Sequence, residues 1–156
     1  MHWLQHKIPP PFYLLGFSLL MWWLDQQLQA WRFGGPLLEW LAYPFLIAGV
    51  LVDGTALLGF IRAKTTVNPM KPEKASQLVV SGMYRFSRNP MYLGMLLLLT
   101  GWALYLGNVA AFALLPVFVG LITVLQIQPE ERALQALFGE QYRQYCRQVG
   151  RWLLFL

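Results

Sequence analysis

"NPMYLGMLLLLTGWALYLGNVAAFALLPVFVGLITVLQIQP", residues 89 to 129, holds no charged side chain over 41 positions. As a single helix this run would be about 60 Å long at ~1.5 Å per residue, whereas the core of a bilayer needs only about 20 residues. A hairpin of two membrane-spanning helices fits this length, and Gly107-Asn108 is its natural turn. We therefore expect spans at about residues 90–106 and 109–127.

The N-terminal half contains two further apolar segments. "PFYLLGFSLLMWWLDQQL" begins at Pro11 and "PLLEWLAYPFLIAGVLVDGTALLGFIR" begins at Pro36, with the turn-like "RFGGP" between them. They predict spans at about residues 11–31 and 36–62. The fold class expected is an all-α integral membrane protein with about four transmembrane helices, formed by residues 1–156 as one membrane-embedded domain.

Composition and charge support this class and suggest an orientation. The chain is 57% hydrophobic and only 12% charged, whereas soluble domains carry roughly 25% charged residues. With a cytoplasmic N-terminus, 11 of the 12 basic residues would lie inside and only Arg32 outside, as the positive-inside rule favours. We expect a multi-pass protein of a bacterial inner membrane, with both termini cytoplasmic. Anionic lipid headgroups explain the net charge of +5, so membrane lipids are expected partners and nucleic acid is not.

Cysteine and histidine content excludes some kinds of site. The lone Cys146 cannot form an intramolecular disulfide, and no paired Cys/His spacing suggests a bound metal ion. We therefore expect no metal in the mechanism.

Two segments are expected on the cytoplasmic side, at residues 63–89 and 130–156. In the first, prolines at positions 69 and 72 oppose a continuous helix, and a short apolar run precedes a Ser-Gly turn signal. This segment is predicted to be an irregular lobe packed under the helices.

The second segment is predicted to be an amphipathic helix. Apolar and aromatic residues recur in it every three or four positions: Leu134, Phe138, Tyr142, Tyr145 and Val149. Such a helix lies along the membrane face or packs over the cytoplasmic ends of the spans. Gly139 within it opposes a continuous helix, because Gly costs about 1 kcal/mol relative to Ala there.

The stretch "YRFSRNPMYLG", residues 84 to 94, has a structural and a functional interpretation. Asn89 suits an N-cap, Pro90 suits the first helical position, and Arg88 would lie among lipid phosphates, so the stretch could simply begin the third span. The free backbone N–H groups of a helix start, with Arg88 beside them, also form a site for a carboxylate or phosphate. The two interpretations are compatible.

Glu130 and Glu131 follow Pro129 in "QPEERALQALFGEQYRQY" and also have two interpretations. Acidic residues in a first helical turn complement the helix dipole by ~0.3–1 kcal/mol. Alternatively, the hairpin formed by residues 89–129 returns these acids to the level of Arg88. A basic helix start opposite an acidic pair would suit a zwitterionic ligand.

Asp53 is an ionisable residue inside an apolar segment. It lies nine residues before Arg62, about 14 Å along a helix, where a charged side chain is costly and usually functional. The alternative is an Asp that is protonated or hydrogen-bonded by a neighbour such as Thr55 or Thr100. Two other acids lie nearer the outer surface and are expected to reach water: Asp25 and Glu39.

Two motifs together resemble those of the integral-membrane isoprenylcysteine carboxyl methyltransferase and phospholipid methyltransferase superfamily. They are "TTVNPMKPEKASQLVVSGMYRFSRNPMYLG" and "PEERALQALFGEQYRQYCRQVGRWL", within residues 65–153. The resemblance implies an S-adenosylmethionine site at the cytoplasmic membrane face. The cofactor-binding residues implied are Ser76, Gln77, Leu78, Val79, Tyr84, Asn89, Pro90, Met91 and Tyr92. The residues implied for catalysis are Glu130, Glu131 and Arg88.

The sequence also departs from the isoprenylcysteine enzymes that it resembles. Those enzymes carry histidine where this chain has Ser76 and Asn89, and arginine where it has Gln126, four residues before Glu130. These differences argue against a prenylcysteine carboxylate as the methyl acceptor and leave the cofactor site intact.

The function expected is S-adenosylmethionine-dependent methyl transfer to a lipophilic carboxylate, amine or thiol. Transfer from a sulfonium is an in-line displacement, so the protein mainly aligns the reactants and excludes water. An ammonium acceptor must first lose a proton, for which Glu130 or Glu131 is the candidate base. Alternative functions are a small transporter that uses Asp53, a membrane reductase that uses NADPH, and a non-enzymatic scaffold.

Overall fold

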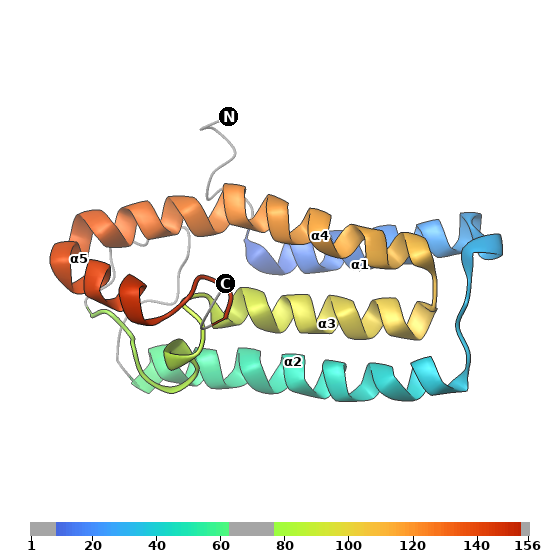
Figure 1. The fold of residues 1–156 in the computed structure, drawn as a ribbon, viewed down its shortest axis with the longest axis horizontal. Helices are drawn as coiled ribbons and strands as arrows, with labels where there is room; N and C mark the ends of the chain where they lie inside the picture. Colours follow the sequence, from blue (N-terminus) through green and yellow to red (C-terminus); the bar gives the residue numbers. More distant parts are fainter. Residues whose placement is uncertain (1–8, 63–76, 154–156) are drawn as a thin grey trace.

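A computed structural model describes residues 9–62 and 77–153, and Ser76 lies outside this range. The described residues are helical apart from turns, short connections and one isolated bridge between Arg32 and Asn108. Successive helices of the bundle run antiparallel (Figure 1). The elements in chain order are α1 (Pro10–Gln27), η2 (Gln29–Trp31), α2 (Pro36–Arg62), η4 (Gly82–Arg85), α3 (Pro90–Leu106), α4 (Val109–Ile122), η5 (Thr123–Ile127) and α5 (Gln128–Gln148).

Local sequence explains the turn between α3 and α4. Gly107 ends α3 in the left-handed conformation (φ 59°), which favours glycine. Asn108 then caps α4, because its Oδ1 accepts a hydrogen bond from the backbone N–H of Ala110 at 3.0 Å. The expected turn at Gly107-Asn108 is therefore confirmed. We call this end of the bundle the turn end and the opposite end, where η4 and α5 lie, the lobe end.

Two helices are long and apolar enough to cross a membrane. They cover Pro36–Gly59 and Val109–Gln148, whereas α3 is apolar but only 17 residues long. Only 17% and 28% of the residues in their most apolar windows are buried inside the protein. Their apolar side chains therefore face outward, unlike those of the core helix of a soluble protein.

Small residues let α2 and α3 pack with their backbones almost in contact. In α2, Ala42, Gly49 and Ala56 recur every seven residues, and in α3 Gly94 and Gly101 have the same spacing. A Cβ added to Gly49 would lie 2.9 Å from the carbonyl oxygen of Gly94, and one added to Gly101 would lie 3.0 Å from that of Ala42. We call this contact the α2–α3 seam. It holds α2 against α3 along most of its length.

The main hydrophobic core lies between α1, α3 and α4. Its largest fully buried side chains include Phe118 from α4, Met21 from α1 and Leu99 from α3. The ring of Phe17 packs edge-on against Phe118, with centroids 5.3 Å apart. This core fixes the direction in which α4 approaches the lobe end.

A group of polar side chains is buried at the turn end. Asp25 is only 3% exposed, and it accepts a hydrogen bond from Arg32 Nε at 2.6 Å and one from Asn108 Nδ2 at 3.1 Å. The expectation that Asp25 reaches water is therefore wrong, because η2 folds Arg32 back over it. Glu39 is exposed, as expected.

The C-terminal half of the hairpin does not end at residue 127. Instead, α4 continues through η5, a five-residue π-helical segment, directly into α5. The chain then reverses at Gly139, whose backbone angles are φ 52° and ψ −118° (Figure 1). The predicted amphipathic stripe lies on the inner side of this turn, with Tyr142, Tyr145 and Val149 buried. The tail helix therefore packs over the lobe end of the bundle.

Candidate active site

The start of α3 forms one side of the site. Asn89 occupies the N-cap position, but its side chain makes no capping hydrogen bond, contrary to the expected role. Its Nδ2 instead donates to the carbonyl oxygen of Arg151 at 3.0 Å, and its backbone N–H donates to Ser87 Oγ at 3.0 Å. The first-turn N–H groups of Met91 and Tyr92 are thus left without the Asn89 cap.

Glu130 faces α3 from the start of α5. The hydroxyl of Tyr92, itself only 4% exposed, donates to Glu130 Oε1 at 2.5 Å. Burial raises the pKa of the Glu130 carboxyl to about 8, the hydrogen bond from Tyr92 opposes this rise, and the charge of Glu131 adds to it. At neutral pH most of this carboxyl is therefore protonated.

Glu131 is held between two guanidinium groups. Its Oε1 lies 3.0 Å from Arg88 Nη1, and its Oε2 lies 2.7 Å from Arg151 Nη2. Arg151 Nε is also within 3.1 Å of Oε1 and 3.2 Å of Oε2. The Arg88–Glu131 pair confirms that the hairpin returns the acidic pair to the level of the α3 start.

Arg88 connects this pair to the tail helix. Its Nη1 also lies 2.7 Å from the sulfur of Cys146, and its backbone N–H donates to the carbonyl oxygen of Gly150 at 3.0 Å. Its Nε is buried and has no hydrogen-bond partner among the residues that the structure describes. A buried guanidinium N–H without an acceptor is costly, so this atom is a candidate donor to a ligand.

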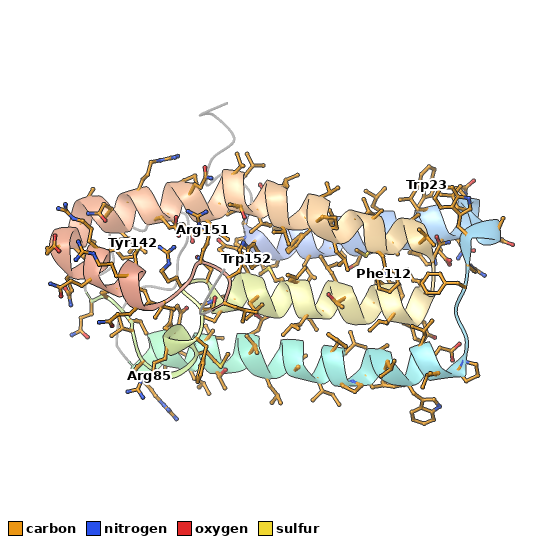
Figure 2. The ribbon with its side chains drawn as sticks, viewed as in Figure 1. Trp23, Arg85, Phe112, Tyr142, Arg151 and Trp152 are labelled. Carbon is orange, nitrogen blue, oxygen red and sulfur yellow. The ribbon has the colours of Figure 1, made fainter. Side chains whose placement is uncertain are left out.

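Aromatic residues close the lobe end next to this cluster. Tyr84, Tyr142 and Tyr145 are buried together with Val79 against Ala56 of α2. The Tyr145 hydroxyl donates to the carbonyl oxygen of Tyr84 at 2.7 Å. Burial raises the pKa of both the Tyr84 and Tyr142 hydroxyls, so both stay neutral. Figure 2 shows Tyr142, Arg151 and Trp152 near this end and Phe112 and Trp23 near the turn end.

The other residues implied for cofactor binding have different environments. Gln77 is exposed, whereas Leu78 and Met91 are partly buried and pack against the tyrosine cluster. Pro90 is fully buried at the start of α3. Together with Val79 and Tyr84, most of the implied set surrounds the lobe end of α3.

Asp53 lies in the α2–α3 seam rather than in this cluster. A Cβ on Gly94 would overlap its carboxylate. The alternative in which Thr55 or Thr100 hydrogen-bonds Asp53 is wrong, because their hydroxyls donate to backbone carbonyls of their own helices, whereas a protonated Asp53 stays a prediction. Asp53 Oδ1 is buried with no partner among the residues described.

Two members of the cluster, Arg151 and Cys146, were not predicted as site residues from sequence. Arg151 could have been found from helix geometry, because Gly139 lies eight residues after Glu131 and about as many before the end of α5. A helix that reverses at its midpoint returns the following residues to its start. Cys146 has no such signal beyond its place on the buried side of the tail helix.

Comparison with known proteins gives the following matches. A model of the family described as phospholipid methyltransferase matches residues 38–141, a range that includes Arg88, Tyr92 and both glutamates. An uncharacterized protein of Haemophilus influenzae is 44% identical over 63 residues, which cover 40% of this chain and all of that protein. No solved structure matches the chain.

Two named methyltransferases are also similar to this chain. The methanethiol S-methyltransferase of Pseudomonas deceptionensis is 32% identical over 171 residues, covering 97% of this chain and 63% of that protein. The protein-S-isoprenylcysteine O-methyltransferase B of Arabidopsis thaliana is 30% identical over 111 residues, covering 71% of this chain and 56% of that protein. The chain thus spans about half to two thirds of the length of these two relatives. It belongs to the phospholipid methyltransferase family, whose members use S-adenosylmethionine as methyl donor.

Proposed function

We propose that this protein is an S-adenosylmethionine-dependent methyltransferase whose site lies at the lobe end, between the start of α3 and the start of α5. One observation carries the proposal: the Arg88–Glu131 ion pair and the Tyr92–Glu130 hydrogen bond join the two motifs that resemble the family. Each contact links residues about 40 positions apart, and both lie within the range that matches the family. Membership of that family favours methyl transfer over the transporter and reductase alternatives.

The residues present fit the amino-acid end of S-adenosylmethionine. A carboxylate matches the buried Arg88 Nε and the N–H groups of Met91 and Tyr92 at the start of α3. An ammonium group would fit beside the carboxyl groups of Glu130 and Glu131, and its charge would favour the ionised form of Glu130. When bound, the cofactor supplies an electrophilic methyl group on a sulfonium, so the chain needs no nucleophile of its own.

Glu130 is the residue proposed to move a proton. The Tyr92 hydroxyl occupies its Oε1, so Oε2 is the atom that would take a proton from the acceptor. A base whose pKa is about 8 is matched to an acceptor that arrives protonated near neutral pH. Tyr92 orients this carboxyl, and Glu131 is held by Arg88 and Arg151 beside it.

This chemistry bears on the class of acceptor. A carboxylate is already nucleophilic and needs no base, whereas a thiol or an ammonium must lose a proton first. A methanethiol S-methyltransferase is among the relatives, and the family is named for phospholipid methylation. We therefore propose a small or lipophilic thiol or amine as acceptor.

The proposed setting is a membrane. Residues 1–156 would form one domain with four spans, formed by α1, α2, α3 and α4 with η5, and with both termini in the cytoplasm of a bacterial cell. The lobe end would then face the cytosol, from which the cofactor enters, while a lipophilic acceptor enters from the bilayer. The outward-facing apolar side chains of α2 support this arrangement.

The test is calorimetric titration of the purified protein with S-adenosylmethionine. We expect micromolar binding by the wild type and at least tenfold weaker binding by Tyr92→Ala and Glu130→Ala. Glu140→Gln is the matched control, because Glu140 is an exposed acid on the same helix. Unchanged affinity in both site variants would sink the assignment. Transfer of labelled methyl groups into membrane extracts and to short-chain thiols would then identify the acceptor.

A further inference from the structure

The segment after α5 crosses the start of α3 and contacts it through its backbone. The carbonyl oxygen of Gly150 accepts the N–H of Arg88 at 3.0 Å, and the carbonyl oxygen of Arg151 accepts the amide of Asn89 at 3.0 Å. The hydroxyl of Ser87 donates to the same Arg151 oxygen at 3.4 Å. We call residues 149–152 the C-terminal strap.

The strap also contacts η5, the segment that leads into the helix with the two glutamates. Trp152 Nε1 donates to Thr123 Oγ1 at 3.3 Å, and Thr123 is the first residue of η5. The Trp152 ring packs against the main core. The strap therefore joins the α3 start to the segment that leads into Glu130, and both walls of the site are held by one peptide.

The Arg151 side chain adds a charged contact between the C-terminal strap and α5. Its guanidinium forms a two-pronged contact with Glu131, whose side chain is only 14% exposed, while Arg88 approaches the same carboxylate from the other side. Bidentate contacts of this kind fix both distance and orientation. One partly buried carboxylate is thus matched by two guanidinium groups.

We propose that Arg151 is a positioning residue that fixes Glu131 beside Arg88 and thereby limits the negative field that Glu131 exerts on Glu130. This inference rests on the proposed function. Among the described residues, the side chain of Arg151 contacts Glu131, so it acts on Glu130 through Glu131. Its effect is to keep Glu130 able to ionise when a proton must be removed.

Several charged or titratable groups face Glu130. On α5, Glu131 follows Glu130 directly, and its charge raises the pKa of Glu130. Tyr92 from α3 donates to Glu130, and Tyr84 from η4 lies close enough for the charge of Glu130 to raise its pKa. Both tyrosines are neutral, so Glu131, which is paired with Arg88 and Arg151, is the charged side chain that acts on Glu130.

The experiment measures the pH dependence of S-adenosylmethionine affinity between pH 6 and 9.5, together with the unfolding temperature at each pH. We expect affinity in the wild type to rise with a midpoint near pH 8, where Glu130 ionises. In Arg151→Gln the midpoint should move upward by about 0.5–1 pH unit, as for loss of a nearby compensating charge. Arg151→Lys keeps the positive charge, so its midpoint should stay close to the wild-type value. Arg147 is exposed, and Arg147→Gln should leave the midpoint unchanged.

A second variant covers the case in which Arg151→Gln does not fold. Glu131→Gln removes the negative field itself and should move the midpoint downward. If affinity falls in Arg151→Gln while the midpoint stays at its wild-type value, Arg151 has only a structural role and the inference is overturned. A midpoint that does not fall in Glu131→Gln also overturns it. A wild-type protein that binds no S-adenosylmethionine would instead refute the proposed function.

Discussion

Replacing Glu130 by Gln is expected to change how stability depends on pH. The raised pKa of Glu130 means that the folded state binds a proton more tightly than the unfolded chain does. Its contribution is therefore fully present below the ordinary pKa of 4.5 and is lost as pH rises through about 8. Glu130→Gln keeps an oxygen acceptor for the Tyr92 hydroxyl and removes the ionisation.

The size of the effect follows from the same values. A rise in pKa from 4.5 to about 8 corresponds to at most about 5 kcal/mol at ~1.36 kcal/mol per pH unit. Between pH 6 and 8 the wild type should lose about 2.5 kcal/mol relative to Glu130→Gln, or roughly 5–10 °C in unfolding temperature for a chain of this size. The stability of the variant relative to the wild type should therefore be higher at pH 8 than at pH 6.

The assay is thermal unfolding in detergent from pH 5.5 to 9, with wild type, Glu130→Gln and Glu140→Gln measured in parallel. The exposed Glu140 pairs only with Arg143 at the surface, so its variant should follow the wild type at every pH. The difference between wild type and Glu130→Gln should grow steadily with pH and level off near pH 8–9. Parallel curves for these two proteins would show that Glu130 ionises normally and would refute the reasoning.

Three further substitutions test the packing around the site. Gly94→Ala should destabilise the protein by about 1–3 kcal/mol in thermal or denaturant unfolding, because the new Cβ overlaps the Asp53 carboxylate. Gly120→Ala is the control and should be neutral or stabilising, because open space surrounds that position. Equal effects of the two substitutions would contradict the described seam. Gly139→Ala should lower the free energy of unfolding by about 1–2 kcal/mol, because the φ of 52° at this position is unfavourable for residues with a Cβ. A protease should then cut the tail helix faster. An unchanged digestion rate would argue against the chain reversal at Gly139. Asp25→Asn should lower the denaturant midpoint of unfolding, because it removes the carboxylate charge that pairs with the half-exposed Arg32, and an unchanged midpoint would count against that pairing.

Apolar patterning and turn chemistry were enough to predict much of the helical arrangement. The Gly107-Asn108 turn followed from residue type alone, since Gly accepts a positive φ and Asn caps a helix. The meeting of Arg88 with Glu131 followed from hairpin length. The first depends on residue type and the second on the length of an uncharged segment, and both can be read from a single sequence.

Features that depend on long-range partners were not predictable in this way. Asp25 was expected in water because nothing local indicates that Arg32 folds back over it. Asn89 was expected to cap α3, but the Arg151 carbonyl, 62 positions away, takes its amide instead. The continuous passage from α4 into α5 through η5 reflects a π-helical turn, for which the sequence carries no simple signal.

The α2–α3 seam restricts the routes by which a membrane-dissolved molecule can reach the site. A Cβ added at Gly49, Gly94 or Gly101 would lie within 3.0 Å of a backbone carbonyl oxygen of the facing helix. Nearer the lobe end, the side chains of Val79 and Tyr84 lie against Gly59 of α2. An acyl chain is far wider than these contacts, so the seam offers it no portal. The proposed lipophilic acceptor would therefore have to enter through another face of the bundle, and substitutions that alter acceptor preference should be sought away from this helix pair.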